Sequence, residues 1–423
     1  MLKTNETPNN RRILSVLIFT ILFILSSGFY SYPSRKKTQT KKADYIEIWH
    51  SFSQSKKELL NSQIERYNNL NQSIKVKSVF KGKPEDLYLD LLARENLPSI
   101  AIVPTFYLKV LAEMDLIIDL GGYLPSKLKK DIPEKFWDSV TVNGKIYGLP
   151  FIYTFPVFFI NQNIIQSRGI PYTEEPANWD QIFNTLKRIK ETTDKYGVYI
   201  PTDSLYDYIE YVESYTDKKV YFKDRIDISS DSAIEAMDVL QKAIYELRYM
   251  PEKLTPEEAQ NMFFSGKLAI ILSDASNLVN FKSTIPYILG VWPLPFGKNT
   301  RPMLIGTSFV IINSSKRYEN ESYKVLEYLL KYENILRWYT HTGAPPIRNS
   351  IKESLELLVF YEENPNHLII TNEAEKADVF NPDFDYISYN KIVKKAIEEI
   401  IINEKSASLI MKKAQSELEA LQK

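Results

Sequence analysis

The order of secondary-structure patterns in residues 45–103 is the feature that most constrains the fold. Five segments alternate between strand and helix periodicity, and the last of them is apolar on both faces and bounded by Pro98 and Pro104: residues 45–49, 51–69, 74–80, 86–93 and 100–103. A short strand that is apolar on both faces is typical of the buried parallel strands of α/β proteins. The order strand–helix–strand–helix–strand therefore predicts an α/β fold with helices on both faces of a parallel sheet.

A second set of strands and helices follows in the middle of the chain. Its members show the same alternation of apolar strands and one-sided helices: residues 155–160, 179–191, 233–249, 268–272 and 308–313. The segment Thr255-Pro256-Glu257-Glu258 predicts a helix start with an N-cap, a proline in the first turn and a capping box. A chain that fills one α/β layer, fills a second and returns to the first makes two lobes. Polar ligands bind in such crevices, at the ends of strands.

The N-terminal region has the character of an export segment. Arg11 and Arg12 precede an apolar run over residues 13–25, and Ser26-Ser27-Gly28 follows. This is the order of a secretory signal, and the run also approaches the length of a short membrane anchor. Residues 1–43 carry eight Lys and Arg against one Glu, and residues 34–42 have no periodicity. We expect a signal peptide or a transmembrane anchor with a basic stem, and a globule that is periplasmic or held at the outer face of the cytoplasmic membrane.

Composition excludes several classes of protein. The chain has no cysteine, which rules out disulfides and thiolate sites, and its three histidines are far apart in sequence, so no metal and no cofactor is expected. Residues 44–423 carry 45 Lys and Arg against 52 Asp and Glu, and an acidic globule argues against nucleic acid as a partner. No nucleophile elbow or phosphate loop is present, so an enzyme is not expected, although a glycosidase with two carboxylates stays conceivable.

An ordered set of short motifs resembles the extracellular solute-binding proteins of carbohydrate ABC importers. The matching segments run through nearly the whole globule: Ile48–Ser51, Lys81-Gly82, Gly144–Phe151, Pro156–Asn161, Phe264–Ala269, Gly290–Pro295, Gly306–Ser308 and Trp338–Pro346. The resemblance implies a two-lobed periplasmic-binding-protein fold, type II-like, with a ligand cleft between the lobes. It implies ABC permease subunits as partners and no catalysis. A surface glycan-binding adhesin on an anchored stem is the alternative from another class.

The motif order predicts the domain boundaries. We expect lobe 1 to contain residues 44–153 and 288–314, and lobe 2 to contain residues 154–287 and 315–423. The crossovers are expected near residues 152–156, 287–296 and 313–317.

The glycerol-3-phosphate-binding branch of the family is most similar, through the Trp-His-Ser start and residues 360–365. Its ligand positions match poorly here. The family's first-lobe Tyr and Glu correspond to Pro84 and Thr105, its hinge-strand Ser to Thr154, and its Ser after the Phe264–Ala269 motif to Asp274. Its Gly corresponds to Gly306, its loop Tyr to Ala344, and its C-terminal Arg to the vicinity of Tyr389 and Lys391. Its two ligand-stacking Trp fall in residues 202–208, which contain no Trp.

These positions and their neighbours define the expected ligand site. The candidate ligand-binding residues are Trp49, His50, Ser51, Lys81, Thr105, Tyr153, Thr154, Asp203, Tyr206, Asp274, Gly306, Thr307 and Tyr389. Carboxylates and hydroxyls suit sugar hydroxyls, and aromatic faces suit a sugar ring. A phosphate needs cations, for which Lys81, Arg348 and Lys391 are available, and Asp274 would repel it. The prediction is therefore a neutral sugar or oligosaccharide, with glycerol-3-phosphate or a glycerophosphodiester as the alternative.

Overall fold

The computed structural model describes residues 45–52, 54–71, 74–169 and 175–422. Chain contacts separate residues 1–40 from a compact unit of residues 41–423. The expected signal peptide, anchor and stem at residues 1–43 lie outside the described part. Within that part, every helix is too short or too polar to cross a membrane.

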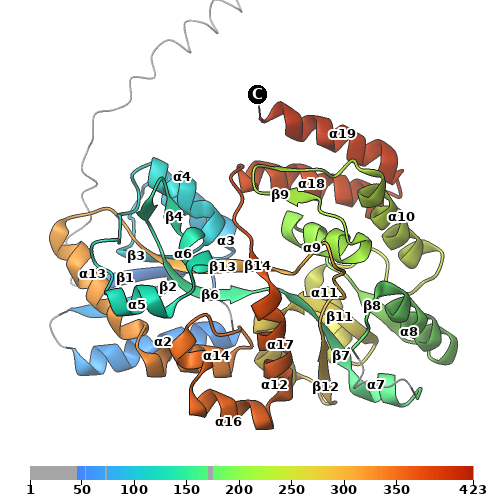
Figure 1. Ribbon diagram of the computed structural model, residues 1–423, viewed down its shortest axis with the longest axis horizontal. Coiled ribbons are helices and arrows are strands. Elements are labelled where there is room, and N and C mark those ends of the chain that lie inside the picture. Colours follow the sequence, from blue (N-terminus) through green and yellow to red (C-terminus); the bar gives the residue numbers. More distant parts are fainter. Residues whose placement is uncertain (1–44, 53, 72–73, 170–174, 423) are drawn as a thin grey trace, which may run out of the picture. The chain divides into compact units, whose positions relative to one another are not determined.

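The first lobe is built on a mixed sheet (Figure 1). Strands β1 (Tyr45–His50), β2 (Lys75–Phe80) and β3 (Ile100–Pro104) are parallel, with β1 in the centre. The sheet is extended by β13 (Met303–Ile311), which runs antiparallel to β3 and pairs with β6 (Leu149–Thr154) and β14 (Asp378–Val379). Helices α2 (Gln54–Leu70) and α3 (Pro84–Ala93) connect the parallel strands. The predicted β–α–β–α–β order is confirmed, although the complete sheet is mixed.

The second lobe has a four-stranded sheet of its own, in the order β12 (Leu289–Trp292), β7 (Pro156–Asn161), β11 (Leu268–Asp274) and β8 (Tyr196–Tyr199). Strands β8 and β11 are parallel, so their carboxyl ends meet at one edge. The helices that pack with these strands or with one another in this lobe include α7 (Gln162–Gln166), α8 (Trp179–Thr192), α9 (Leu205–Thr216), α10 (Asp231–Tyr245), α11 (Pro256–Phe264), α12 (Leu278–Thr284), α17 (Pro365–Lys376), α18 (Tyr386–Ile401) and α19 (Ala407–Ala420).

Local signals in the sequence explain why these helices begin where they do. In α11, the Thr255 hydroxyl accepts from Glu258 N at 3.2 Å, and Thr255 N donates to the Glu258 carboxylate at 2.8 Å. The predicted capping box is thus confirmed, and Pro256 occupies the first turn. Helix α8 buries its expected apolar stripe of Trp179, Ile182, Leu186 and Ile189, whereas Phe183 is only half-buried.

The chain crosses from one sheet to the other with a single residue between β6 and β7. Thr154 ends β6 opposite Ile305 of the first sheet, and Pro156 begins β7 opposite Asp274 of the second. This crossing lies in the segment 152–156 where the sequence predicted it. A second crossing separates β12 from β13.

Two of the expected lobe assignments differ in part from the strand pairing. Residues 288–314 are expected in lobe 1, where β13 does lie, but β12 pairs with β7 in the second sheet. Residues 315–423 are expected in lobe 2, where α18 packs against α9 and α10, but α13 (Lys316–Leu329) packs against α2 and β1, and β14 pairs with β13. An apolar pattern shows that a segment is buried, but it does not show against which sheet.

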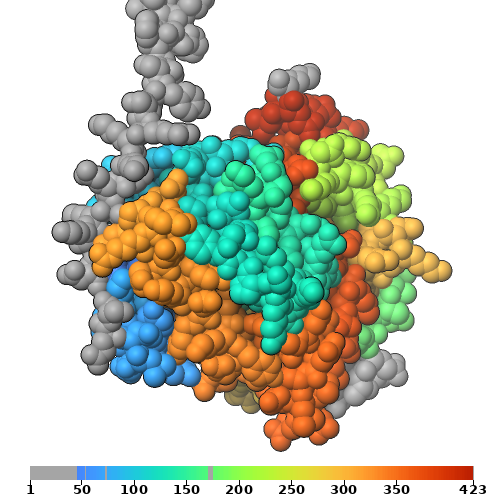
Figure 2. Space-filling view, turned by 60° about the vertical axis from the view of Figure 1, so that its left-hand side comes forward, coloured from blue at the N-terminus to red at the C-terminus, as the bar shows by residue number. Residues whose placement is uncertain are grey.

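The first lobe also has a large covering layer from the late part of the chain. Figure 2 shows the segment around residues 120–150, in teal, beside the segment around residues 315–370, in orange. The Tyr123 hydroxyl donates to the Asn320 side chain at 3.2 Å, and Arg348 pairs with Asp131. Residues more than 190 positions apart therefore share this face.

Candidate ligand-binding site

A cavity of about 300 Å³ lies at the carboxyl ends of β8 and β11. Its polar lining consists of Tyr199, Asp203, Tyr206, Asp207, Gln260, Ser273 and Asp274. Phe155 and Pro156 of the crossing and Ile305 of the first sheet complete the wall. The cavity therefore lies where the chain passes between the two sheets, the position at which α/β proteins of this kind bind ligands.

A larger hollow, of about 590 Å³, lies beside β14 and the hairpin strands β9 (Tyr221–Phe222) and β10 (Arg225–Ile226). It is lined by charges of both signs, including Lys135, Arg301 and Asp378. It does not adjoin the carboxyl ends of β8 and β11. We therefore assign the ligand to the smaller cavity.

Turns at two helix starts hold the carboxylates of the cavity. Ser204 caps α9, where its hydroxyl accepts from Asp207 N at 3.0 Å and donates to the Asp207 carboxylate at 2.5 Å. Asp274 caps the short helix η2 (Ala275–Asn277), and its Oδ1 accepts from Ser276 N at 2.8 Å and from Ser276 Oγ at 2.6 Å. Thr154 Oγ1 also donates to Asp274 Oδ1, which joins the predicted residues Thr154 and Asp274. Among the described residues, none donates a hydrogen bond to Asp274 Oδ2.

The electrostatic character of the cavity is acidic. Burial and the nearby charges of Asp203 and Asp274 raise the pKa of Asp207 to about 7, although the Ser204 hydrogen bond opposes the shift. No Lys or Arg lines the cavity among the described residues. The cation that reaches it is Lys56, whose Nζ donates to Ser276 Oγ at 2.6 Å. Burial lowers the pKa of Lys56, and the charge of Asp274 works against that shift.

The edge of the first lobe carries four buried polar atoms without a hydrogen-bond partner in the described chain. They belong to residues at the carboxyl ends of β1 and β3: His50 Nε2, Ser51 Oγ, Thr105 Oγ1 and Tyr107 Oη. Unpaired buried polar groups are rare because each costs about 1–3 kcal/mol. Four of them on neighbouring strands mark an edge that a polar ligand can satisfy. The predicted residues His50, Ser51 and Thr105 meet here, whereas the sequence analysis missed Tyr107.

His50 is a neutral donor at this edge. Burial and the charge of Lys57 lower the pKa of His50 to about 4, against the opposing backbone hydrogen bond at Phe52. Its Nδ1 accepts from Phe52 N at 3.1 Å. The neutral ring therefore carries its proton on Nε2, a buried N–H that is free to donate to a ligand oxygen.

Two contacts join the two halves of the site. Lys56 follows the β1 edge in α2 and reaches Ser276 beside Asp274. The ring of Tyr386 in α18 packs at a tilt against that of Phe106, next to Tyr107, with the ring centres 4.1 Å apart. Burial, followed by the charge of Asp207 and then the neighbouring Tyr107, raises the pKa of Tyr386, which places Tyr386 between the two edges.

Several predicted ligand residues have other roles. Lys81 forms an ion pair with Asp90 and lies 4.0 Å from the centre of the Trp49 ring, and Trp49 is buried with its indole N–H bonded to Glu47. Neither residue lines the acidic cavity, and their role as ligand contacts stays a prediction. The ion pair with Asp90 of α3 keeps the Lys81 side chain on the surface of its own lobe.

Tyr153, Gly306 and Thr307 form a structural cluster on β6 and β13. The Tyr153 hydroxyl bonds to Ser139 Oγ at 2.7 Å, and the residue is fully buried. A Cβ on Gly306 would lie 2.3 Å from Cε1 of Tyr153, so the ring occupies the space that a side chain would need. Thr307 Oγ1 donates to Ile152 O at 3.3 Å. Packing across two strands accounts for each of these positions, and none of them lines the acidic cavity. Their ligand role stays a prediction.

Tyr389 lies away from the acidic cavity. It stacks on Phe384 at 4.2 Å, its hydroxyl accepts from Gln422 Nε2 at 2.9 Å, and it borders a separate hollow beside α19. Its role as a ligand contact stays a prediction, which rests on the resemblance to the family's C-terminal Arg and on no sequence motif at that position.

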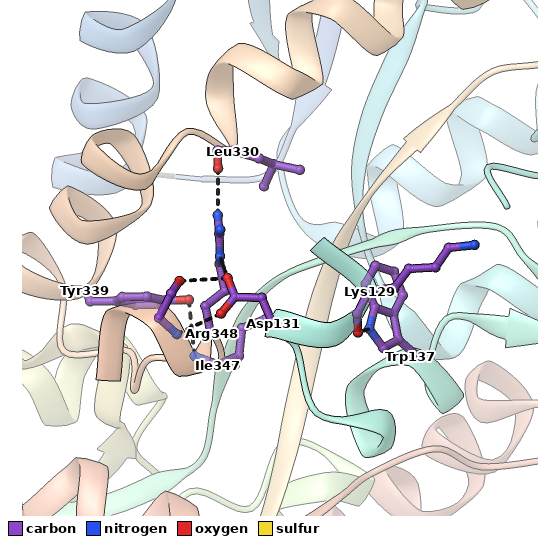
Figure 3. A network of polar contacts seen from close by, with 8 residues as sticks. Lys129, Asp131, Trp137, Leu330, Tyr339, Ile347 and Arg348 are labelled. Atoms are coloured by element: carbon purple, nitrogen blue, oxygen red, sulfur yellow. Dashed lines mark hydrogen bonds and ion pairs between the residues drawn. The ribbon is translucent and has the colours of Figure 1, made fainter. Parts of the chain in front are cut away.

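The remaining candidate phosphate ligands are unavailable to the cavity. Arg348 donates from Nε to Asp131 Oδ2 at 2.6 Å and from Nη1 to Leu330 O at 2.8 Å, as Figure 3 shows. Burial raises the pKa of Asp131, but hydrogen bonds from Ser350 and Arg348 outweigh that effect and lower it. Lys391 is an exposed residue of α18 and does not line the cavity.

The sequence analysis also missed Tyr199 and Asp207. Tyr199 ends β8 and Asp207 lies in the first turn of α9, so both follow directly from the strand–turn–helix order. The signal that identifies them is the position of Tyr199 and Asp203 after a buried strand, read together with the Ser204 cap.

The two sheets, the crossing between them and the polar edges on each side define a two-lobed protein that holds a polar ligand between its lobes. Residues 62–367 match the model of the family described as bacterial extracellular solute-binding protein, and the chain belongs to this family. The predicted family and fold are thereby confirmed.

Individual relatives are distant. The chain is 22% identical over 361 residues to the sn-glycerol-3-phosphate-binding periplasmic protein UgpB of Pectobacterium atrosepticum, covering 78% of this chain and 79% of the relative. UgpB from Mycobacterium tuberculosis in complex with glycerophosphocholine has a TM-score of 0.80 at 16% identity, covering 89% and 98% of the two chains. Maltose-bound MalE3 from T. maritima has a TM-score of 0.78 at 19% identity, covering 89% and 99%. At these identities the likeness to the solved structures establishes the fold.

Proposed function

We propose that this protein captures a sugar or oligosaccharide outside the cytoplasmic membrane and delivers it to the permease subunits of an ABC importer. The observation that carries the proposal is the site itself. Carboxylates and hydroxyls from the second lobe face a cavity beside an edge of unpaired donors and acceptors from the first. Sugars offer many hydroxyls that both donate and accept, and such a site satisfies them.

The alternative ligand is glycerol-3-phosphate or a glycerophosphodiester, which the names of the UgpB relatives favour. A phosphate group requires fixed cations or oriented amides. Lys81 and Arg348 are held by Asp90 and Asp131, and the cavity presents three aspartates. The charge of the site therefore favours a sugar over a phosphate.

We also propose that residues 1–43 direct export, as a cleaved signal or as an anchor. The function is capture and release without a chemical step. A panel of chromogenic glycosides should therefore stay intact in the presence of the protein, and hydrolysis of any of them would contradict this part of the proposal.

Calorimetry tests the ligand. The protein is titrated with malto-oligosaccharides and with glycerol-3-phosphate, and the titrations are repeated with Asp274→Ala and Lys391→Ala. We expect Asp274→Ala to abolish saccharide binding and Lys391→Ala to leave it nearly unchanged. Because Asp274 also caps η2, circular dichroism of Asp274→Ala and the milder Asp274→Asn variant separates a lost ligand contact from a lost fold. Tight glycerol-3-phosphate binding that survives Asp274→Ala and is lost in Lys391→Ala, or in Arg348→Ala titrated in the same way, would overturn the choice.

A further inference from the structure

The acidic cavity carries more negative charge than the binding of a neutral sugar requires. Asp203, Asp207 and Asp274 line it together, and no Lys or Arg among the described residues does so. One more acidic residue stands behind this lining, because the charge of Glu258 acts on Tyr199. Glu210 lies near Tyr206, but burial raises its pKa well above the usual value and favours its neutral form. Lys56 does not line the cavity, but its Nζ donates to Ser276, which in turn donates to Asp274. A neutral ligand would leave this excess of negative charge in place.

The carboxylates keep oxygens that no protein group uses. Asp274 Oδ1 accepts hydrogen bonds from Ser276 and Thr154, whereas Oδ2 accepts none from the described residues. Asp207 accepts one side-chain hydrogen bond, from Ser204, and Asp203 is exposed at the rim without a bonded partner among described residues. Free carboxylate oxygens around a small cavity are acceptors for a group with several N–H donors.

A buried tyrosine independently marks the same cavity as a place for a ligand. Tyr199 is only 3% exposed and lines the cavity, and its hydroxyl has no hydrogen-bond partner in the described residues. Its pKa is raised by burial and then by Asp203 and Asp207, which places the phenol among these carboxylates. Tyr199 and Tyr206 also supply ring surface, and aromatic rings attract cations.

From the three aspartates, the absence of lining cations and the unpaired Tyr199, we infer that the ligand is an amino sugar whose protonated amine is seated in this cavity. The inference rests on the proposed function, since it specifies the sugar. The ammonium group donates to Asp203, Asp207 and Asp274, and the remaining hydroxyls extend toward His50, Ser51 and Thr105 at the first-lobe edge. It replaces the expectation of a neutral saccharide.

The experiment compares matched oligosaccharides that differ only at the nitrogen. Calorimetry of the full chain uses a glucosamine tetramer, its fully N-acetylated counterpart and a neutral glucose tetramer. Loss of a charge-assisted contact should weaken binding about tenfold or more, so we expect the glucosamine tetramer to bind at least that much tighter than the other two. Equal affinity for all three would overturn the inference and leave the proposed function standing. Binding of glycerophosphocholine with no binding of any tetramer would overturn both.

Two variants assign the effect to the cavity. Asp203→Asn removes a charge at the exposed rim, where folding is not at stake, and should weaken glucosamine-tetramer binding about tenfold while the N-acetylated tetramer changes less than about twofold. The matched control is Asp194→Asn, an exposed aspartate of the same lobe that does not line the cavity. Equal losses in Asp203→Asn and Asp194→Asn, or equal losses for both tetramers, would show that a specific ammonium contact is absent.

Discussion

Lys56 of the first lobe donates from Nζ to Ser276 Oγ of the second lobe at 2.6 Å, and Ser276 in turn donates to Asp274. The two residues are 220 positions apart and join the lobes at the mouth of the proposed site. Because the bond spans both lobes, it stabilises their approach. A ligand that contacts both edges shifts the same equilibrium toward closure.

Lys56→Met should weaken ligand affinity about three- to tenfold, since a half-buried interlobe hydrogen bond to a charged group contributes about 1 kcal/mol. Small-angle scattering should show a larger radius for the ligand-free variant than for the wild type. Lys127→Met, an exposed lysine of α5 (Ser126–Asp131), is the control. An unchanged radius and affinity in Lys56→Met would show that the bond does not stabilise closure.

Ligand saturation should reduce the radius of gyration of the wild type, because the two polar edges lie on different lobes. Scattering with and without the saccharide that calorimetry identifies measures this directly. Saturation without compaction would contradict binding between the lobes.

Asp207 should make stability depend on pH. Its folded pKa of about 7 lies above the usual value, so the folded state holds a proton that the unfolded state releases between about pH 4 and pH 7. Stability therefore falls as pH rises through this window and levels off above it. Asp207→Asn removes this pH dependence. The free energy of unfolding of the variant should therefore exceed that of the wild type by an amount that grows from pH 4 upward and reaches on the order of 2 kcal/mol at pH 7.

Chemical denaturation at pH 4.5, 6 and 7.5 measures that difference. The groups that face Asp207 are Ser204, Asp203, Tyr206 and Glu210 around α9, Tyr199 of β8, Asp274 of β11 and Tyr386 of α18. A difference that is constant with pH would mean that Asp207 titrates normally.

Gly306→Ala should lower stability by about 1–3 kcal/mol, because the new Cβ would lie 2.3 Å from a buried Tyr153 ring that has no room to move. Gly122→Ala is the matched control, since nothing lies within 4 Å of its Cβ position. Thermal unfolding of both variants checks the expectation. Similar melting temperatures for the two would disprove the packing role of Gly306.

Arg348→Ala should lower the free energy of unfolding by about 3–5 kcal/mol, because the largely buried carboxylate of Asp131 would lose its ion-pair partner. The side chains of Arg348 and Asp131 are 15% and 11% exposed. Ligand affinity of the folded fraction should stay within about twofold of the wild type, as Arg348 lies outside the cavity. If Arg348→Ala kept its stability but lost binding of glycerol-3-phosphate, Arg348 would be a ligand contact and not a structural residue.

Local features of this protein were determined by the sequence alone. The apolar strand at residues 100–103 and the capping box at Thr255 follow from neighbouring residues, because hydrogen bonds and side-chain periodicity act over a few positions. The motif order likewise indicated the family before any contact was known. His50, Ser51, Thr154 and Asp274 entered the predicted site through the family resemblance, and the structure places each of them at or after the end of a strand.

Only the tertiary structure decided which of these residues share a site. The register of β13 against β6 buries Tyr153 over Gly306, and the packing of α5 against the segment after α14 (Tyr332–His341) commits Arg348 to Asp131. Strand pairing places β12 in the second sheet, and the parallel alignment of β8 and β11 brings Tyr199 and Asp207 to Asp274. Such contacts join residues tens to hundreds of positions apart, and their energies depend on geometry that an apolar or charged pattern does not encode.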